Sequence, residues 1–129
     1  MREIKFRGMS LNGWVYGHYV VLVDSFGEPV DCIWETGASR GTPVDRKSVG
    51  QFTGLEDKNG TEIYEGDVLK ICNSGLRCQI IYGAPSFCRK WIDKVSMRHR
   101  NLMEPMTWNT HIIYEVIGNI HEHKHLLEE

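Results

Sequence analysis

The sequence lacks the features that would place it in a membrane or, by charge alone, on nucleic acid. It has no apolar run of the roughly 20 residues that a membrane-spanning helix needs. Its opening residues, Met1–Arg7, are charged rather than signal-like. Lysine and arginine total 15 against 17 acids, giving a net charge of -2, whereas nonspecific nucleic-acid binding normally needs a basic excess. We therefore expect a cytoplasmic protein with no membrane partner.

Cysteine is scarce and carries no metal-binding or redox spacing. No two of Cys32, Cys72, Cys78 and Cys88 are separated by two residues, as zinc knuckles and thioredoxin-like motifs require. A chain of 129 residues can bury about two-thirds of its unfolded surface, so it needs neither a disulfide nor a metal to fold. We expect reduced thiols packed as small hydrophobic side chains, and no cofactor. A zinc site built from three or four cysteines is the less favoured alternative.

Motifs of known catalytic chemistry are also absent. The sequence has no nucleophile elbow, no zinc-binding helix and no phosphate-binding loop. Most of its acidic residues fall in predicted turns, where carboxylates accept backbone hydrogen bonds. A protein without enzymatic activity is therefore favoured, and a small hydrolase or nuclease is the least favoured interpretation.

Proline is rare, with 4 residues against 13 glycines, and the glycines separate short β-branched and aromatic runs. The connections are too short for crossover helices, so the pattern predicts a β-meander. Asn12-Gly13 and Asn59-Gly60 predict hairpin turns, with Gly60 at positive φ. Gly17 interrupts the longest run and indicates a bulge or a bend. The predicted strands are Ile4–Arg7, Trp14–Val23, Val30–Trp34, Val49–Thr53, Val68–Cys72, Arg77–Tyr82 and Thr110–Ile117.

The pattern predicts one all-β domain over residues 1–129, which is an ordinary length for a single domain. Residues in these strand-like runs should form its core, because turn signals flank each run. The predicted core residues are Ile4, Phe6, Trp14, Val21, Phe52, Ile63, Val68, Ile71, Ile81, Ile113 and Val116.

Several segments resemble the YopX family of small phage and prophage proteins. The densest match is Thr53–Val68, with the sequence TGLEDKNGTEIYEGDV. The other matching segments are Met1–Arg7, Gly13–Gly17, Val44–Leu55 and Tyr114–Ile120. The resemblance implies a mainly β fold, part of which is an SH3-like barrel. Together with the residue pattern, it predicts an all-β domain with an SH3-like barrel portion and additional N-terminal strands, and the pattern allows one short helix. It also implies an accessory protein of a phage or prophage in a bacterial host cell, and it carries over no catalytic residue or ligand.

The acidic segment Gly54–Asp67 is the first candidate site. An EF-hand loop places ligands at positions 1 and 12 around a glycine at position 6. With Gly60 at position 6, these ligand positions fall on Leu55 and Gly66, neither of which offers a side-chain oxygen. The segment is therefore interpreted as a structural turn rather than a cation site.

The second candidate is the histidine cluster that replaces the usual family pattern after Ile120. In an extended segment His121, His123 and His125 would share one face, and that arrangement can hold a transition metal. A solvated polar tail with one helical turn is the favoured alternative.

The third candidate is the basic part of residues 83–109, a stretch outside the family match. Its residues combine positive charge with an aromatic surface, as single-strand nucleic-acid binders do. Neither helical nor strand periodicity dominates there, so we expect an irregular segment in which partner recognition concentrates. A strand pair with a long loop and a short helix are the alternatives. The candidate nucleic-acid or partner-binding residues are Arg89, Lys90, Trp91, Arg98 and Arg100.

The most favoured function is contact with other proteins, by self-association or with a phage or host protein. A meander leaves strand edges that can pair with another chain. A nucleic-acid-binding module that uses residues 89–100 is the alternative.

Overall fold

A computed structural model describes residues 4–72, 75–83, 86–92, 103–105 and 114–127. The fold is all-β, as predicted, and its only helical elements within these ranges are two short 3-10 turns, η1 and η2. Within the same ranges, no helix is long and apolar enough to cross a membrane. The chain forms two compact units, unit 1 over residues 1–52 and unit 2 over residues 53–129. Whether the two units unfold together, as a single domain would, stays a prediction.

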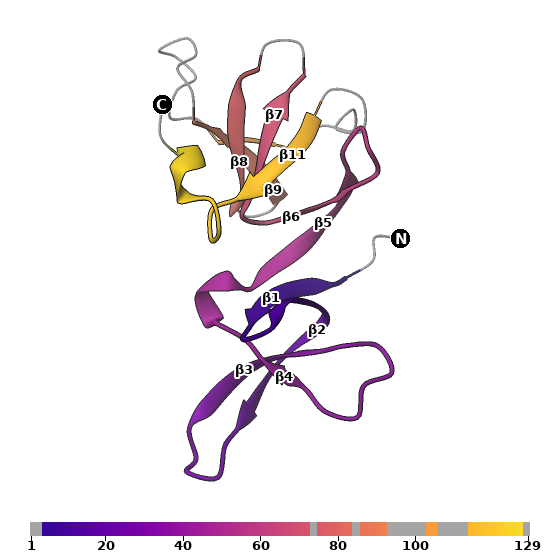
Figure 1. Cartoon of the computed structure of the whole chain (residues 1–129), viewed down its shortest axis with the longest axis vertical. Coiled ribbons are helices and arrows are strands. Elements are labelled where there is room, and N and C mark those ends of the chain that lie inside the picture. Colours follow the sequence, from indigo (N-terminus) through magenta and orange to yellow (C-terminus); the bar gives the residue numbers. More distant parts are fainter. Residues whose placement is uncertain (1–3, 73–74, 84–85, 93–102, 106–113, 128–129) are drawn as a thin grey trace. The chain divides into compact units, whose positions relative to one another are not determined.

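Unit 1 is an antiparallel sheet with the strand order β4-β3-β2-β1-β5 (Figure 1). A short turn at Leu11-Asn12 joins β1 to β2, and a longer turn joins β2 to β3. The predicted loop between Thr36 and Ser48 contains both β4 and η1. The elements of this unit are β1 (Phe6–Ser10), β2 (Gly13–Val23), β3 (Pro29–Trp34), β4 (Thr42–Pro43), η1 (Arg46–Ser48) and the start of β5 (Gly50–Glu56).

Strand β2 changes its pairing partner in the middle. Its first half, up to Gly17, pairs with β1, and its second half, from His18 onward, pairs with β3. Gly17 marks this change because the backbone of β3 comes very close to it. A Cβ atom at Gly17 would lie 2.2 Å from the carbonyl oxygen of Trp34, well inside van der Waals contact. The predicted irregularity at Gly17 is therefore the point where the strand moves from one partner to the other.

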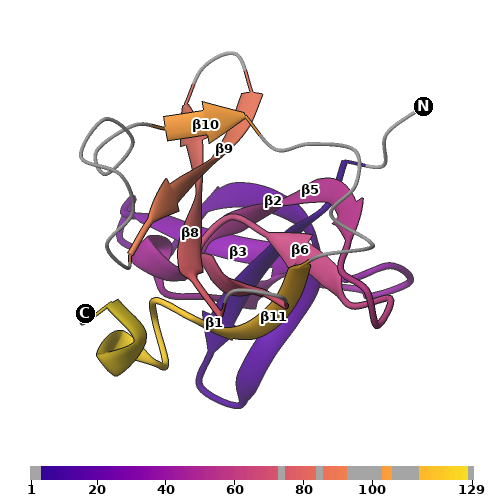
Figure 2. The same cartoon turned by 90° about the horizontal axis from the view of Figure 1, so that it is seen from above.

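Unit 2 contains a second antiparallel sheet with the order β10-β9-β8-β7-β11, and Figure 2 shows β8, β9 and β10 in sequence order. Strand β11 returns to the other edge of β7, with a β-bulge between Val116 and Gly118. Strands β9 and β10 confirm the strand-pair alternative for part of residues 83–109. The elements are β6 (Glu62–Tyr64), β7 (Asp67–Ile71), β8 (Arg77–Gly83), β9 (Ser86–Trp91), β10 (Met103–Pro105), β11 (Tyr114–Asn119) and η2 (Lys124–Leu127).

The core of unit 2 is a cluster of fully buried side chains from four strands. Its members, Ile63, Leu69, Cys78, Ile80 and Tyr114, are each at most 1% exposed. Burying such side chains stabilises the fold by about 1.5–3 kcal/mol each. A buried cysteine in this cluster agrees with the expectation of thiols that pack as small hydrophobic groups.

Two of the predicted core residues are wrong. Ile4 is 63% exposed because it precedes β1. Val21 is 54% exposed because it lies in the far part of the β2–β3 hairpin, which forms a ribbon of two strands. The fully buried isoleucine of β8 is Ile80, while the predicted Ile81 points to the opposite face and is half-buried. Ile113 lies outside the described residues.

The Asn-Gly turns form with a different backbone from the one expected. Gly60 has a φ of 79°, which confirms its predicted conformation. No residue other than glycine has a positive φ in the described part of the chain, so Asn12 and Asn59 do not adopt the left-handed conformation of a type I′ turn. At the second turn, hydrogen bonds from the backbone to the Asp57 side chain hold this conformation instead.

The close approach at Gly17 leads to a stability prediction. Gly17→Ala should destabilise the protein by about 2 kcal/mol or more, because the new methyl group must displace backbone rather than a flexible side chain. Urea unfolding followed by circular dichroism measures this loss. The neighbouring His18 is exposed, so His18→Ala is the matched control and should change stability by less than about 0.5 kcal/mol. Equal effects of the two substitutions would contradict the steric account.

Candidate functional site

The acidic turn of the family-like segment is organised by one buried carboxylate. Asp57 is only 2% exposed, although it lies in the turn between β5 and β6. Its Oδ1 accepts hydrogen bonds from the backbone N–H groups of Asn59 and Thr61, at 2.8 and 2.9 Å. The backbone of the same turn closes through Asp57 N–H to the Thr61 carbonyl at 2.9 Å and Gly60 N–H to the Asp57 carbonyl at 3.0 Å.

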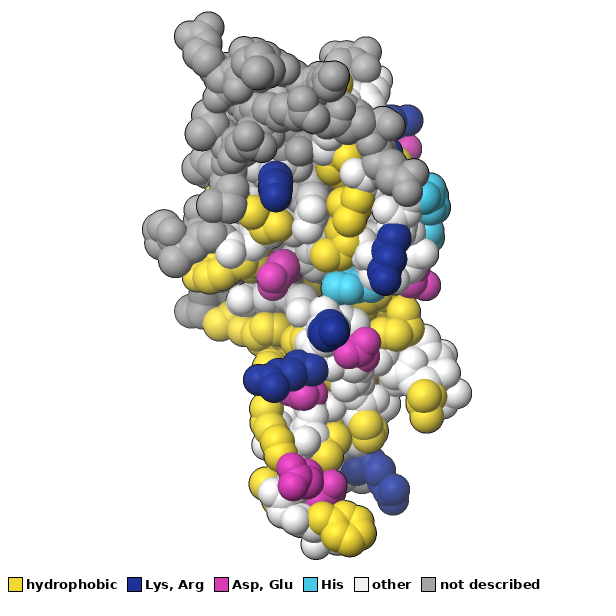
Figure 3. Space-filling view, turned by 90° about the vertical axis from the view of Figure 1, so that its left-hand side faces the viewer, with side chains coloured by type: hydrophobic (Ala, Val, Ile, Leu, Met, Phe, Trp, Pro, Cys, Tyr) yellow, Lys and Arg dark blue, Asp and Glu magenta, His cyan; other side chains and the backbone are white. Residues whose placement is uncertain are grey.

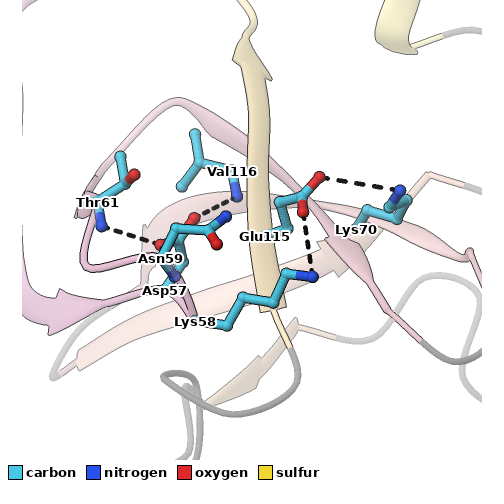
Figure 4. Close-up of polar contacts among 7 residues, drawn as sticks. All are labelled: Asp57, Lys58, Asn59, Thr61, Lys70, Glu115 and Val116. Carbon is cyan, nitrogen blue, oxygen red and sulfur yellow. Dashed lines mark hydrogen bonds and ion pairs between the residues drawn. The ribbon is translucent and has the colours of Figure 1, made fainter.

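The second oxygen of Asp57 joins this turn to the last strand. Its Oδ2 accepts the N–H of Val116 in β11 at 2.9 Å (Figure 4). The backbone N–H of Lys58 donates to the Tyr114 carbonyl at 3.0 Å, so the turn contacts β11 at two points. Two segments that carry the family resemblance, 59 residues apart along the chain, are therefore held together by one side chain.

Ion pairs lie on the outer side of this junction. Glu115 of β11 is 3.4 Å from Lys58 Nζ and 3.8 Å from Lys70 Nζ, and Figure 4 shows the carboxylate between the two lysines. The hydrogen bond with Glu115 and the negative charge of that carboxylate raise the pKa of Lys58. Because all three charged side chains are partly exposed, the pairs contribute little to stability.

This geometry assigns the acidic segment a structural role. Both oxygens of Asp57 accept hydrogen bonds from backbone N–H groups, so the carboxylate holds its own turn and joins it to β11. Asp67, the other buried acid of the segment, accepts the N–H of Tyr64 at 2.8 Å. Within the described parts of the chain, no group of three or more His, Cys, Asp or Glu residues could hold a metal.

The histidine tail folds back onto the end of β11. Asn119 N–H donates to His123 Nδ1 at 3.2 Å, and Asn119 Oδ1 accepts the N–H groups of His121 and Glu122. The rings of His123 and His125 meet edge to face at 6.1 Å. The tail thus contains the predicted helical turn as η2. In this arrangement His121, His123 and His125 do not form a group that could hold a metal, and metal binding by these residues stays a prediction.

Gly118 makes room for this tail. A Cβ atom there would lie 2.6 Å from a methyl carbon of Leu126 and 2.8 Å from His123 Nδ1. Arg77 fixes the far end of the tail by donating to the Leu126 carbonyl at 2.8 Å. The Gly118-Asn119 pair therefore does more than end the strand. Gly118 leaves room for Leu126 of η2, and Asn119 holds the turn that precedes η2.

The basic segment is only partly described. Arg89 is half-buried, with its guanidinium 5.8 Å from the centre of the Tyr114 ring, so it packs on unit 2. Lys90, the next residue of β9, is exposed. Trp91 ends β9, and Arg98 and Arg100 lie outside the described residues. A nucleic-acid role for residues 89–100 therefore stays a prediction, with Lys90 as its exposed cation in the described part.

Unit 1 presents a hydrophobic surface on the far part of the β2–β3 hairpin, which Figure 3 shows in yellow at the lower end of the view. Val21, Leu22 and Val23 are 54%, 42% and 69% exposed, and Phe26 at the tip is 88% exposed. The face that bears Val21 also carries a hydrogen bond from the Tyr19 hydroxyl to Asp31, which raises the pKa of Tyr19. We call the segment from His18 to Glu28 the distal hairpin.

Sequence reasoning missed this surface because it assigned Val21 to the core. One signal could have revealed it. Tyr19–Val23 is a run of five consecutive apolar residues in a single strand, whereas a strand with one buried face alternates apolar and polar residues. Such a run has apolar side chains on both faces, so a ribbon of two strands cannot bury all of them.

Unit 1 also has an open hollow of about 430 Å³ beside the turn between β1 and β2. It is lined by Met9–Leu11 and Pro43–Asp45. Its one carboxylate, Asp45, caps η1 by accepting the N–H of Lys47 at 3.1 Å. The other polar side chain of the lining, Ser10, is also engaged locally, since its hydroxyl donates to the Gly13 carbonyl at 2.8 Å.

Comparisons with known proteins agree with this arrangement. The family model described as YopX protein matches residues 9–128, which includes both segments that Asp57 joins. No curated protein matches the chain. Among solved structures, the crystal structure of protein EF1440 from Enterococcus faecalis is similar, with 25% sequence identity and a TM-score of 0.56. The match covers 99% of this chain and 100% of that chain.

The role of Asp57 can be measured by substitution. Asp57→Ala leaves three backbone N–H groups without their acceptor and should destabilise the protein by about 3 kcal/mol. Asp57→Asn keeps one acceptor oxygen and should fall between this variant and the wild type. Lys58→Ala removes only an exposed ion pair and should cost much less than Asp57→Ala. If urea unfolding ranked Lys58→Ala as the most damaging variant, the carboxylate would not be the organising contact.

Proposed function

Because the chain belongs to the YopX family, we propose that it is an accessory protein of a phage or prophage that works through protein–protein contacts of its distal hairpin. The observation that carries this proposal is the exposed apolar surface of Val21, Leu22, Val23 and Phe26. Exposed apolar patches of this kind mark sites of interaction with other proteins.

The architecture of the distal hairpin supports a contact role. A hairpin of two strands is marginally stable in water by itself, and additional pairing or packing stabilises it. Strand β4 pairs with Cys32 and Ile33 of β3, and the next residue, Val44, donates its N–H to the Asp31 carbonyl at 2.9 Å. The part of the hairpin between Asp31 and Phe26 has no third strand among the described residues. A bound protein would supply the missing contact.

We propose a second copy of this chain as the partner that occupies the distal hairpin. Residues Tyr19–Val23 carry no charged side chain, so two identical copies can approach without like charges facing each other. The same surface, present on each copy, is what a two-fold symmetric interface requires.

Unit 2 is, in this proposal, the scaffold, and its sheet corresponds to the SH3-like barrel that the family resemblance implies. The proposed location is the cytoplasm of the bacterial host cell.

Analytical ultracentrifugation over a wide concentration range tests the proposal. The wild type should show a mass that rises with concentration. The double variant Val23→Ser, Phe26→Ser should weaken association at least about ten-fold, because burying a valine and a phenylalanine is worth more than the 1.4 kcal/mol that a factor of ten requires. Leu11→Ser is the matched control, since Leu11 is fully exposed at the other end of β2. A wild type that stays monomeric at every concentration would refute self-association.

A further inference from the structure

Strand β2 is longer than either of its partners, and this leaves part of its edge open. It has 11 residues, while β1 has 5 and β3 has 6. Because β1 and β3 lie on opposite edges of β2, the half that pairs with β3 has no partner on its β1 side among the described residues. The open edge is the backbone of His18–Val23, visible in the lower part of Figure 1 where the hairpin continues beyond β1.

This open edge has none of the features that usually prevent strand pairing. Exposed edge strands are normally short, or carry lysine, proline or a bulge that blocks another strand. Strand β4, at the outer edge of the same sheet, follows this rule, because it has two residues and ends in Pro43. His18–Val23, in contrast, contains no lysine, proline or glycine, and pairs with β3 without a break in register.

We propose that the open edge of β2 pairs in an antiparallel manner with the same edge of a second copy, so that the two unit 1 sheets become continuous. This inference rests on the proposed function and specifies how the distal hairpin makes its contact. Strand addition of this kind uses backbone hydrogen bonds for affinity and the flanking side chains for specificity.

Symmetry restricts the register of such a pair. Two identical antiparallel strands are related by a two-fold axis perpendicular to the sheet, so one residue must lie opposite its own copy. The axis can pass through Val20 or Val21 if the pairing is to stay within the open edge. The register with Val20 on the axis is excluded, because Val23 would then lie opposite Gly17. The edge of Gly17 that faces β1 is already paired with Phe6.

The register with Val21 on the axis gives each other residue of the open edge a compatible partner on the second copy. It places Leu22 opposite Val20 and Val23 opposite Tyr19, and an aromatic residue opposite a β-branched one is a favourable cross-strand pair. It also places Asp24 of one copy opposite His18 of the other, which brings no like charges together. Val23, the most exposed residue of the strand, is then covered.

Charge substitution at Val21 tests this register. Val21 is 54% exposed, so Val21→Lys and Val21→Glu should both leave the monomer folded, which circular dichroism checks. Each variant alone should associate at least about ten-fold more weakly than the wild type, because two like charges would face each other on the axis. An equimolar mixture should recover a dimer that contains one copy of each variant. Leu11→Lys is the control for added charge and should associate like the wild type.

Cysteine cross-linking gives a second readout. In a Cys72→Ser background, which removes the half-buried thiol, Val21→Cys should form a disulfide-linked dimer under mild oxidation. Val23→Cys should not, since the two Val23 positions lie on opposite sides of the axis, about 13 Å apart along the strand.

These outcomes separate the inference from the proposed function. A wild type that is monomeric overturns both. If the wild type associates and Phe26 contributes, but the lysine and glutamate variants do not complement each other and Val21→Cys does not cross-link, the distal hairpin is the interface and edge pairing is wrong. The pairing is supported if the lysine and glutamate variants together form a dimer, and if Val21→Cys cross-links while Val23→Cys does not.

Discussion

The hydrogen bonds of the Asp57 carboxylate are the interaction on which unit 2 depends. One side chain satisfies two backbone N–H groups in its own turn and a third in β11, the last strand of the sheet. An acceptor that serves three donors is costly to remove, because three backbone N–H groups would lose their partner at once. This explains why the most recognisable segment of the chain, around Asp57-Lys58-Asn59-Gly60, has a structural role.

In unit 1 the corresponding constraint is the length of β2. The strand changes partner at Gly17, where only a glycine tolerates the approach of the Trp34 carbonyl oxygen. The change leaves its second half paired on one side, with apolar side chains exposed on a ribbon of two strands. The two units therefore differ in how their polar backbone is satisfied. In unit 2 the Asp57 carboxylate accepts backbone N–H groups of the turn and of β11. In unit 1 the open edge of β2 keeps backbone donors and acceptors that another strand can satisfy.

Much of the fold could be predicted from the sequence, because its signals are local. Glycine punctuation and β-branched runs located most strands, and Gly60 has the expected φ. Contacts distant along the chain could not be predicted in this way. Nothing near Asp57 indicates that it bonds Val116, and an apolar run does not show whether Ile80 or Ile81 faces the core. The prediction that Val21 lies in the core is wrong for the same reason, because a local pattern does not reveal how many strands cover a hairpin.

Amide hydrogen exchange across β2, measured at several protein concentrations, is the most direct test of the central claim that this edge is where the molecule makes its contact. In an antiparallel strand, every second N–H points to the same edge. In dilute protein the edge-facing amides of His18–Val23 should exchange rapidly, and they should become protected as concentration rises, while the amides of Val68 and Leu69 stay protected throughout. Protection of His18–Val23 that does not change with concentration, whether high or low, would contradict the account.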